Sequence, residues 1–233
     1  MRLHRFYIPT PIGSDKNLRI ESEDMIHQIR KVFRLGVGDK VIVFDGSGFD
    51  YICEILETEK SASLMSLQVS EIVKSRFMPE RQVVLAAALV KKDNFEWIAE
   101  KATELGISRI IPVVAERSEK KFLNEDRLQK ILIEASEQSG RGNIPTLEKM
   151  IDFSDAVSMS IESKIVFHTE GEKWQKETGK DSGPVMIFIG PEGGWSDAEL
   201  EMFQKYNIPT YCLGSQILRA ETAVVAALSQ VVF

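Results

Sequence analysis

Apolar residues recur along this chain in two patterns: short continuous runs, and repeats with helical spacing. In the larger, second part of the chain, runs rich in β-branched and aromatic residues predict buried strands over 82–89, 109–114, 164–167, 185–189 and 209–213. Repeats with helical spacing predict helices over 93–105, after Asn124, after Ser196 and over 220–231. Because strands and helices alternate, this part is expected to be an α/β domain with a mostly parallel sheet.

The pattern is different in roughly the first seventy residues, where the predicted elements are mostly strands. Strands are predicted over 3–8, 40–44, 49–56 and 64–73, and a helix is predicted to begin at Ser22. Asp45-Gly46, between two of these strands, is a hairpin signal. The pattern predicts a small β-barrel, and the polar stretch around Pro79 indicates the boundary with the α/β domain.

A glycine loop follows the apolar run that ends at Ile189. The loop is Gly190-Pro191-Glu192-Gly193-Gly194, and Ser196 with Glu199 then has the spacing of a capping box that begins a helix. Proteins of the α/β class present backbone N–H groups to a ligand at such a turn. The alternative is a tight turn between strand and helix that binds no ligand.

A second glycine loop, Gly214-Ser215-Gln216, leads into the last helix, and two such loops can line one pocket. Neither loop has the spacing of a phosphate-binding motif, so the ligand is not expected to be held by its phosphates. Arg219, Glu221 and Thr222 place a cation, a carboxylate and a hydroxyl within one turn of this loop. Ordinary helix capping and a surface ion pair are the alternative interpretation.

Arg141 lies just beyond the end of the helix predicted after Asn124. An arginine there can satisfy the last helix carbonyls and the helix dipole. The functional alternative is that Arg141 binds a phosphate or a base edge.

The composition of the 233-residue chain, 43% hydrophobic and 27% charged, is typical of a globular protein. The sequence has no apolar run that could span a bilayer and no signal-peptide core, so we expect a cytoplasmic protein without a membrane partner. Cys53 and Cys212 lie far apart in strand-like runs, and the three histidines are scattered. This predicts neither a disulfide nor a metal site.

The net charge of −6 argues against nonspecific binding of nucleic acid, but it permits a local basic surface. Basic side chains gather near Phe6 in the first part of the chain: Arg2, His4, Arg5, Arg30, Lys31 and Arg34. Such a mixture suits phosphate contacts combined with base stacking. The alternative is a solvated helix face beside a core aromatic residue.

Several longer motifs are spread over the whole chain. They are His4-Arg5-Phe6-Tyr7, Val32-Phe33-Arg34 with Gly38-Asp39, the stretch 97–106 with Arg117-Ser118, the stretch 134–141, and the two glycine loops with Glu221-Thr222-Ala223. In these motifs the chain resembles the bacterial 16S ribosomal RNA (uridine-N3)-methyltransferases of the SPOUT superfamily. Three positions depart from the family pattern: Trp195 stands where Phe is expected, Gln216 where Arg is usual, and Ala220 where Thr is usual.

The resemblance implies two domains. A PUA-like β-barrel for RNA binding is expected over 1–73, followed over 74–233 by a SPOUT domain of the α/β class whose chain forms a trefoil knot. The resemblance also implies that the protein uses S-adenosylmethionine to methylate N3 of a uridine in 16S ribosomal RNA of the small ribosomal subunit. A homodimer with active sites at the subunit interface is expected as well.

Site residues follow from the same resemblance. The predicted cofactor pocket consists of the two glycine loops and a preceding strand end: His168, Thr169, Glu170, Gly190, Glu192, Gly193, Gly194, Leu213, Gly214, Ile217, Leu218 and Thr222. Uridine N3 must lose a proton, so a base or a group that stabilises the anion is expected. Arg141 and Arg219 are candidates to hold the anion. Glu221 and Glu192 are both candidate bases, and Gln138 joins the basic cluster as a predicted RNA contact.

Three other functions fit parts of the pattern. One is a SPOUT methyltransferase that acts on a different RNA position. Another is a non-catalytic RNA-binding or ribosome-assembly factor, which would bind RNA with a steep salt dependence but no cofactor. The third is a nucleotide-dependent oxidoreductase, against which the missing dinucleotide fingerprint counts.

Overall fold

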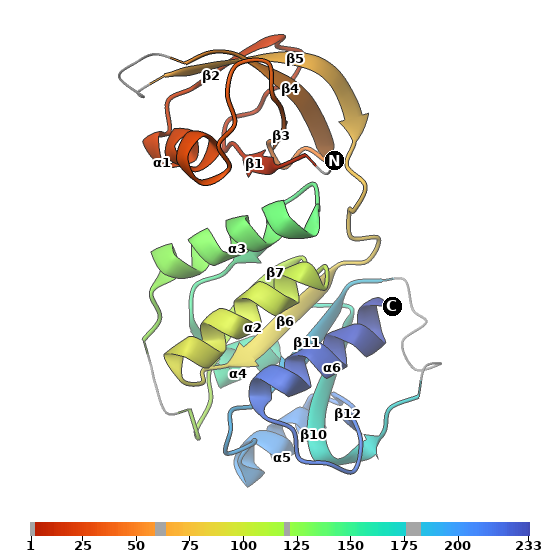
Figure 1. Cartoon of the computed structure of the whole chain (residues 1–233). Coiled ribbons are helices and arrows are strands. Elements are labelled where there is room, and N and C mark those ends of the chain that lie inside the picture. Colours follow the sequence, from red (N-terminus) through yellow and green to blue (C-terminus); the bar gives the residue numbers. More distant parts are fainter. Residues whose placement is uncertain (1–2, 59–63, 119–121, 176–182) are drawn as a thin grey trace. The chain divides into compact units, whose positions relative to one another are not determined.

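The computed structural model describes residues 3–58, 64–118, 122–175 and 183–233 (Figure 1). The chain forms two compact units, one of Met1–Met78 with Ser136–Ile144, and one of Pro79–Ala135 with Pro145–Phe233. The predicted division at residues 73 and 74 separates the chain earlier and leaves 136–144 in the second domain. The observed division differs from the predicted one because residues 75–77 and 136–144 are hydrogen-bonded within the first unit. For example, Gly142 N donates to Phe77 O at 2.9 Å.

The first unit is a mostly antiparallel sheet with one short helix. Its strands are β1 (Arg5–Tyr7), β2 (Asn17–Ile20), β3 (Lys40–Phe44), β4 (Phe49–Thr58) and β5 (Met65–Lys74), paired in the order β1-β3-β4-β5-β2. Only the β1–β3 pair is parallel among these described strands. The predicted strands are confirmed, whereas the short β2 was not predicted.

The predicted cap at Ser22 is confirmed. Helix α1 (Glu23–His27) begins there, with the Ser22 hydroxyl accepting from Met25 N at 3.3 Å, and continues as a π-helical turn, η1 (Gln28–Val32). Ile26 and Ile29 on this segment are buried in the core of the unit together with the inward-facing residues Val41 and Val43 of β3.

The second unit contains a seven-stranded sheet in which every described pairing is parallel. The strand order is β12-β10-β11-β6-β7-β8, with β9 also paired to β7. The strands are β6 (Val83–Ala88), β7 (Arg109–Val114), β8 (Thr146–Leu147), β9 (Ile151–Asp152), β10 (Ser163–Lys173), β11 (Val185–Ile189) and β12 (Thr210–Cys212). The predicted α/β class with a mostly parallel sheet is therefore confirmed.

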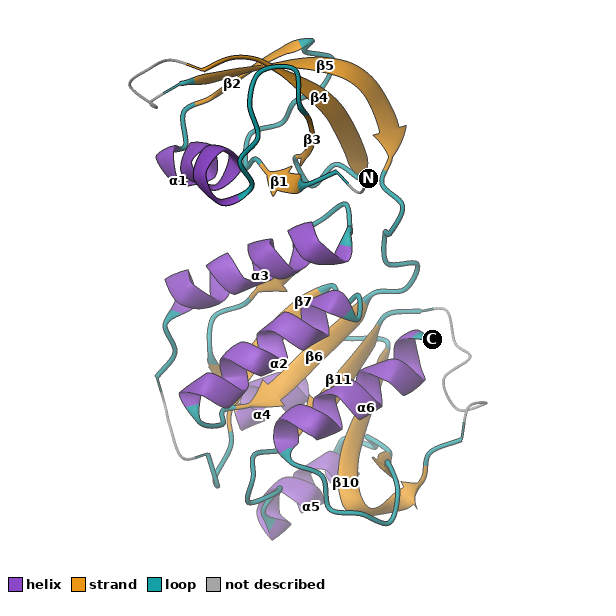
Figure 2. Ribbon diagram, viewed as in Figure 1, coloured by secondary structure: helices purple, strands orange, loops and turns teal. Residues whose placement is uncertain are grey.

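Helices cover both faces of this sheet (Figure 2). α2 (Lys92–Glu104) packs against α6 (Ala220–Val232), while α4 (Phe153–Ser158) packs against α5 (Asp197–Lys205) on the other face. Every residue of β6 and β11 is buried, as their unbroken apolar sequences predicted. The remaining helix, α3 (Glu125–Ser139), has its last turn in the first unit. None of the helices in the described part of the chain is long and apolar enough to cross a membrane.

An aromatic cluster fills the core between the sheet and the helices α4 and α5. Phe153, Phe188 and Trp195 surround Phe203, with ring centroids 4.9 to 5.2 Å from it. The cluster fixes the start of α5, because Trp195 comes immediately before its cap Ser196.

Candidate functional site

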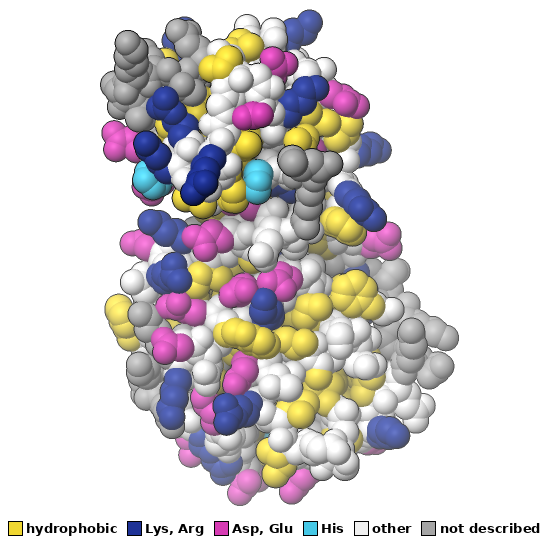
Figure 3. Space-filling view, viewed as in Figure 1, with side chains coloured by type: hydrophobic (Ala, Val, Ile, Leu, Met, Phe, Trp, Pro, Cys, Tyr) yellow, Lys and Arg dark blue, Asp and Glu magenta, His cyan; other side chains and the backbone are white. Residues whose placement is uncertain are grey.

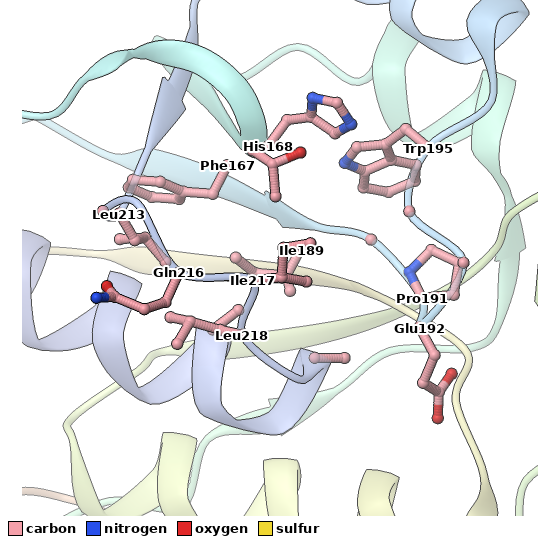
Figure 4. A pocket seen from close by; sticks show the side chains of 17 residues that line it. Phe167, His168, Ile189, Pro191, Glu192, Trp195, Leu213, Gln216, Ile217 and Leu218 are labelled. Atoms are coloured by element: carbon pink, nitrogen blue, oxygen red, sulfur yellow. The ribbon is translucent and has the colours of Figure 1, made fainter.

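A pocket lies at the carboxyl ends of the parallel strands β11 and β12, beside the middle of β10, which pairs with both (Figure 4). It is lined by residues 167–169 of β10, by Ile189 at the end of β11 with the loop 190–195, by 213–214 and 216–218 after β12, and by Ala220 and Ala223 of α6. Its volume of about 250 Å³ approaches the roughly 300–1,000 Å³ typical of small-molecule sites. In α/β sheets ligands bind at this edge, so the two glycine loops meet where a ligand is expected.

The first glycine loop is tightly folded. Gly194 N donates to Pro191 O at 2.8 Å, and Gly194 has a φ of +67°, which favours glycine. Gly190 lies against the Trp195 ring, since a Cβ there would approach the ring to 3.2 Å. A side chain at either glycine would strain or crowd this wall of the pocket.

Two charged side chains brace the loop from outside. Arg117 Nη1 donates to the carbonyl oxygens of Gly193 and Trp195 at 3.0 and 3.1 Å. Glu199 accepts from Ser196 N at 2.8 Å and from Glu116 N at 2.9 Å. The predicted capping box is confirmed. The brace by Arg117 could not be predicted, because it joins residues 76 positions apart.

Most of the predicted cofactor residues line this pocket: His168, Thr169, Gly190, Glu192, Gly193, Gly194, Leu213, Gly214, Ile217 and Leu218. Glu170 and Thr222 do not line it, and both are exposed. On α6 the lining positions are Ala220 and Ala223, one helical turn apart, so Thr222 lies on a different side of the helix. Trp195, Gln216 and Ala220, the three positions expected to depart from the family pattern, are all lining residues.

The candidate acidic groups differ in their surroundings. Glu192 lines the pocket, and its Oε1 accepts from Asn94 Nδ2 at 3.4 Å. Glu221 lies in the first turn of α6, and its Oε2 is buried without a hydrogen-bond partner among the described residues. Arg219 is the exposed N-cap residue of α6. Neither Arg219 nor Glu221 lines the pocket itself.

Arg141 belongs to the first compact unit, whereas the residues that line the pocket belong to the second. Its side chain is only 3% exposed, and its Nε and Nη2 donate to Asn143 Oδ1 at 3.3 and 3.1 Å. Burial lowers the pKa of Arg141 to about 10. Arg141 belongs to the first unit and Arg219 to the second, and their shared role in holding the uridine anion stays a prediction.

Arg5 is part of a buried network in the first unit rather than of an open basic surface. Its guanidinium forms an ion pair with Asp50, which also accepts from the Ser75 hydroxyl, and both ionic side chains are less than a tenth exposed. Arg5 Nη2 also donates to the carbonyl of Arg141 at 3.1 Å. The Arg5 side chain is 7% exposed, so little of its guanidinium is available for the predicted RNA contact.

The other predicted RNA contacts lie mainly at the surface. Figure 3 shows basic side chains gathered over α1 and the turn that follows it. His4, Lys31 and Arg34 are exposed, Arg30 is half-buried, and the His4 ring stacks on Phe33 with centroids 3.8 Å apart. Gln138, at the end of α3, is exposed in the same unit. Arg2 lies outside the described residues.

A metal cannot be assigned to this pocket. Within 3–58, 64–118, 122–175 and 183–233, no group of three or more His, Cys, Asp or Glu side chains is arranged to hold an ion. The lining instead combines glycine backbone, aliphatic side chains and a few polar groups, which suits an organic ligand.

Comparisons with known proteins agree across nearly the whole chain. Residues 78–232 match the family described as RNA methyltransferase domain, and residues 26–64 match the RNA methyltransferase PUA domain. Ribosomal RNA small subunit methyltransferase E of Rickettsia conorii is 31% identical, over 99% of this chain and 96% of that protein. The protein of the same name from Bacillus subtilis is 33% identical over 88% of this chain and 86% of its own.

A solved structure is also similar to this chain over nearly its whole length. A Legionella pneumophila protein described as a methyltransferase, in complex with the bound cofactor SAM, superimposes with a TM-score of 0.89 at 26% identity. The match covers 99% of this chain and 97% of that one.

Proposed function

This chain belongs to the RNA methyltransferase family, and from that premise we propose that it methylates 16S ribosomal RNA of the small subunit, using S-adenosylmethionine, at N3 of a uridine. The observation that carries the proposal is the pocket in which both glycine loops meet beside residues 167–169 of β10. Support for the substrate comes from the names of the Rickettsia and Bacillus relatives.

The residues of the pocket fit S-adenosylmethionine. Ile189, Leu213 and Leu218 offer apolar surface for an adenine ring, and the glycine loops offer backbone groups to an uncharged nucleoside. The buried Nε1 of Trp195, which has no acceptor among the described residues, leaves a donor for a polar atom. When bound, S-adenosylmethionine supplies a methyl group on a cationic sulfur.

The residues of this chain hold the ligand in position and accept the proton of the uridine. A pocket braced by Arg117 and Glu199 holds its ligand in one orientation, and positioning of this kind can supply much of the rate of a displacement reaction. The uridine N3 proton needs an acceptor, and Glu192 and Glu221 are the two candidate bases. Arg219, exposed at the start of α6, is proposed to stabilise the uridine anion or hold a neighbouring phosphate.

RNA binding is proposed for the first unit. The match of residues 26–64 to the PUA domain of RNA methyltransferases supports this assignment. The exposed His4, Lys31 and Arg34 are proposed to contact RNA phosphates and bases. Arg5 is left out, because its side chain is paired with Asp50.

Three further properties belong to the same proposal. We propose a trefoil knot at the C-terminal end of the chain and a homodimer, as the resemblance to SPOUT enzymes implies. Apolar side chains at and beside α6 support a subunit contact there, since Ile217 is 88% and Phe233 is 76% exposed. The cytoplasm, which contains the ribosomal RNA of bacteria, is the proposed location.

The direct test is a methylation assay. Purified protein and S-adenosylmethionine are incubated with small ribosomal subunits that lack this modification, and the digested RNA is analysed by mass spectrometry. The proposal predicts N3-methyluridine in 16S ribosomal RNA. Methylation of transfer RNA alone would favour the SPOUT enzyme with another target. RNA binding without any binding of S-adenosylmethionine would favour the non-catalytic factor.

A further inference from the structure

The indole nitrogen of Trp195 is a buried hydrogen-bond donor without a protein acceptor. Trp195 is 2% exposed, and its ring packs against Phe153 and Phe203 at centroid distances of 5.4 and 5.2 Å. Its Nε1 has no partner in the described part of the protein. Because buried polar groups are nearly always hydrogen-bonded, we expect this N–H to donate to an acceptor other than the described residues of the protein.

The unpaired nitrogen faces the pocket. Trp195 is a lining residue, and a Cβ built on Gly190, which also lines the pocket, would lie 3.3 Å from Nε1. Figure 4 shows the nitrogen edge of the indole turned toward the side of the pocket where His168 lies. Nε1 itself is buried, and because Gly190 has no Cβ, only glycine backbone stands beside it on this side of the pocket wall.

A second tryptophan shows that a buried N–H without a partner is not by itself evidence of a ligand contact. Trp174 Nε1 also has no partner among the described residues, and its ring packs against Phe167 and Tyr211 at 5.5 and 5.1 Å. Trp174, however, does not line the pocket. What distinguishes Trp195 is a free donor at the wall of a ligand-sized cavity.

His168 provides a second donor on the same wall. Its Nδ1 accepts from Glu170 N at 3.3 Å, which leaves Nε2 as the ring nitrogen that can donate. Nε2 is 3.9 Å from the position that a Cβ on Gly194 would occupy, which places it at the glycine loop. Two ring N–H donors beside a lining of glycine backbone, aliphatic side chains and a few polar groups suit a ligand with an apolar base and an oxygen acceptor.

We propose that the Trp195 N–H is a specificity-determining donor, which binds an oxygen of the S-adenosyl ligand, either a ribose hydroxyl or the amino-acid carboxylate. This inference rests on the proposed function. It gives a role to one of the positions at which the chain departs from the family pattern, because the Phe expected there has no N–H to donate.

The test is calorimetric titration of the full-length protein with S-adenosylhomocysteine. Trp195→Phe is expected to bind about tenfold more weakly than the unmodified protein, the loss typical of one hydrogen bond. Trp174→Phe is the matched control and is expected to bind unchanged. If Trp195→Phe bound with the original affinity, this inference alone would be overturned. If the unmodified protein did not bind S-adenosylhomocysteine, the proposed function would fall together with it.

A second ligand identifies the acceptor. 5′-Methylthioadenosine has the ribose but no carboxylate. An equal loss of affinity for both ligands in Trp195→Phe places the ribose at Nε1, and a loss confined to S-adenosylhomocysteine places the carboxylate there. Either result supports the donor.

A third variant separates the N–H from the size of the ring. If Trp195→Phe does not fold, the indole is replaced by its benzothiophene analogue in a Trp97→Phe, Trp174→Phe background. This change keeps the size of the ring and removes only the donor, and near-UV circular dichroism checks the fold. The same tenfold loss is expected, and an unchanged affinity overturns the proposal.

Discussion

Arg117 Nη1 donates a hydrogen bond to the carbonyl oxygen of Gly193 at 3.0 Å, and the same nitrogen donates to Trp195 O at 3.1 Å. One guanidinium thus holds two carbonyls of the glycine loop from outside the pocket. Because Arg117 does not line the cavity, it acts on a ligand only through the shape of the loop. Its effect on binding can therefore be separated from direct contact.

We predict that Arg117→Ala weakens S-adenosylhomocysteine binding roughly five- to tenfold, because the loop loses two hydrogen bonds that preorganise it. Titration calorimetry measures the change. Arg109→Ala is the control, since Arg109 forms only a partly exposed ion pair with Glu148 in the same unit. Equal affinities of the two variants would show that the loop keeps its shape without Arg117.

The buried pair of Arg5 and Asp50 leads to a prediction about stability. Asp50→Asn leaves the Arg5 guanidinium buried with a weaker partner, so the free energy of unfolding should fall by about 3–5 kcal/mol. Urea unfolding measures it. Glu71→Gln removes the same charge from an exposed position on β5 and should change stability by less than about 0.5 kcal/mol. Similar stabilities for both variants would mean that Arg5 is free for another partner.

The sequence predicted what local patterning decides. The strands at 40–44, 109–114 and 185–189 have the bounds observed for β3, β7 and β11, because each is a continuous apolar run between turn residues. β2 and α4 were not predicted. Each is short, with only four and six residues, so its periodicity is too brief to stand out.

The features of the site that depend on local sequence could likewise be predicted. Glycine loops after strands are local signals, and the structure brings both to one pocket. The environments of Arg5 and Arg141 were not predictable, because they depend on contacts between residues up to 136 positions apart. A basic residue in sequence looks the same whether it lies at the surface or in a buried ion pair. The brace by Arg117 and the unpaired nitrogen of Trp195 likewise exist only once distant segments have packed.

Exposed basic residues of the first unit lead to a prediction about RNA. Lys31→Glu with Arg34→Glu should weaken binding of small-subunit RNA and lower the slope of log affinity against log salt by about 0.7–0.9 for each phosphate that is no longer neutralised. Filter binding at several salt concentrations measures this. Lys16→Glu with Arg19→Glu makes the same charge change around β2. A slope reduced equally by both pairs would mean that net charge, and not this surface, determines binding.

The last prediction distinguishes the two candidate bases. Glu192 lines the pocket and is already hydrogen-bonded by Asn94, whereas Glu221 has a buried oxygen without a partner in the residues described. A carboxylate that accepts the uridine proton should lose at least about 100-fold in single-turnover methylation when it is replaced by Gln, with cofactor affinity retained. We expect this result for Glu221→Gln, because Oε2 of Glu221 does not have to give up an existing hydrogen bond before it accepts a proton. For Glu192→Gln we expect a change of less than about tenfold, since its Oε1 already accepts a hydrogen bond. The reverse order of losses would assign the proton to Glu192 and leave Glu221 a structural role at the start of α6.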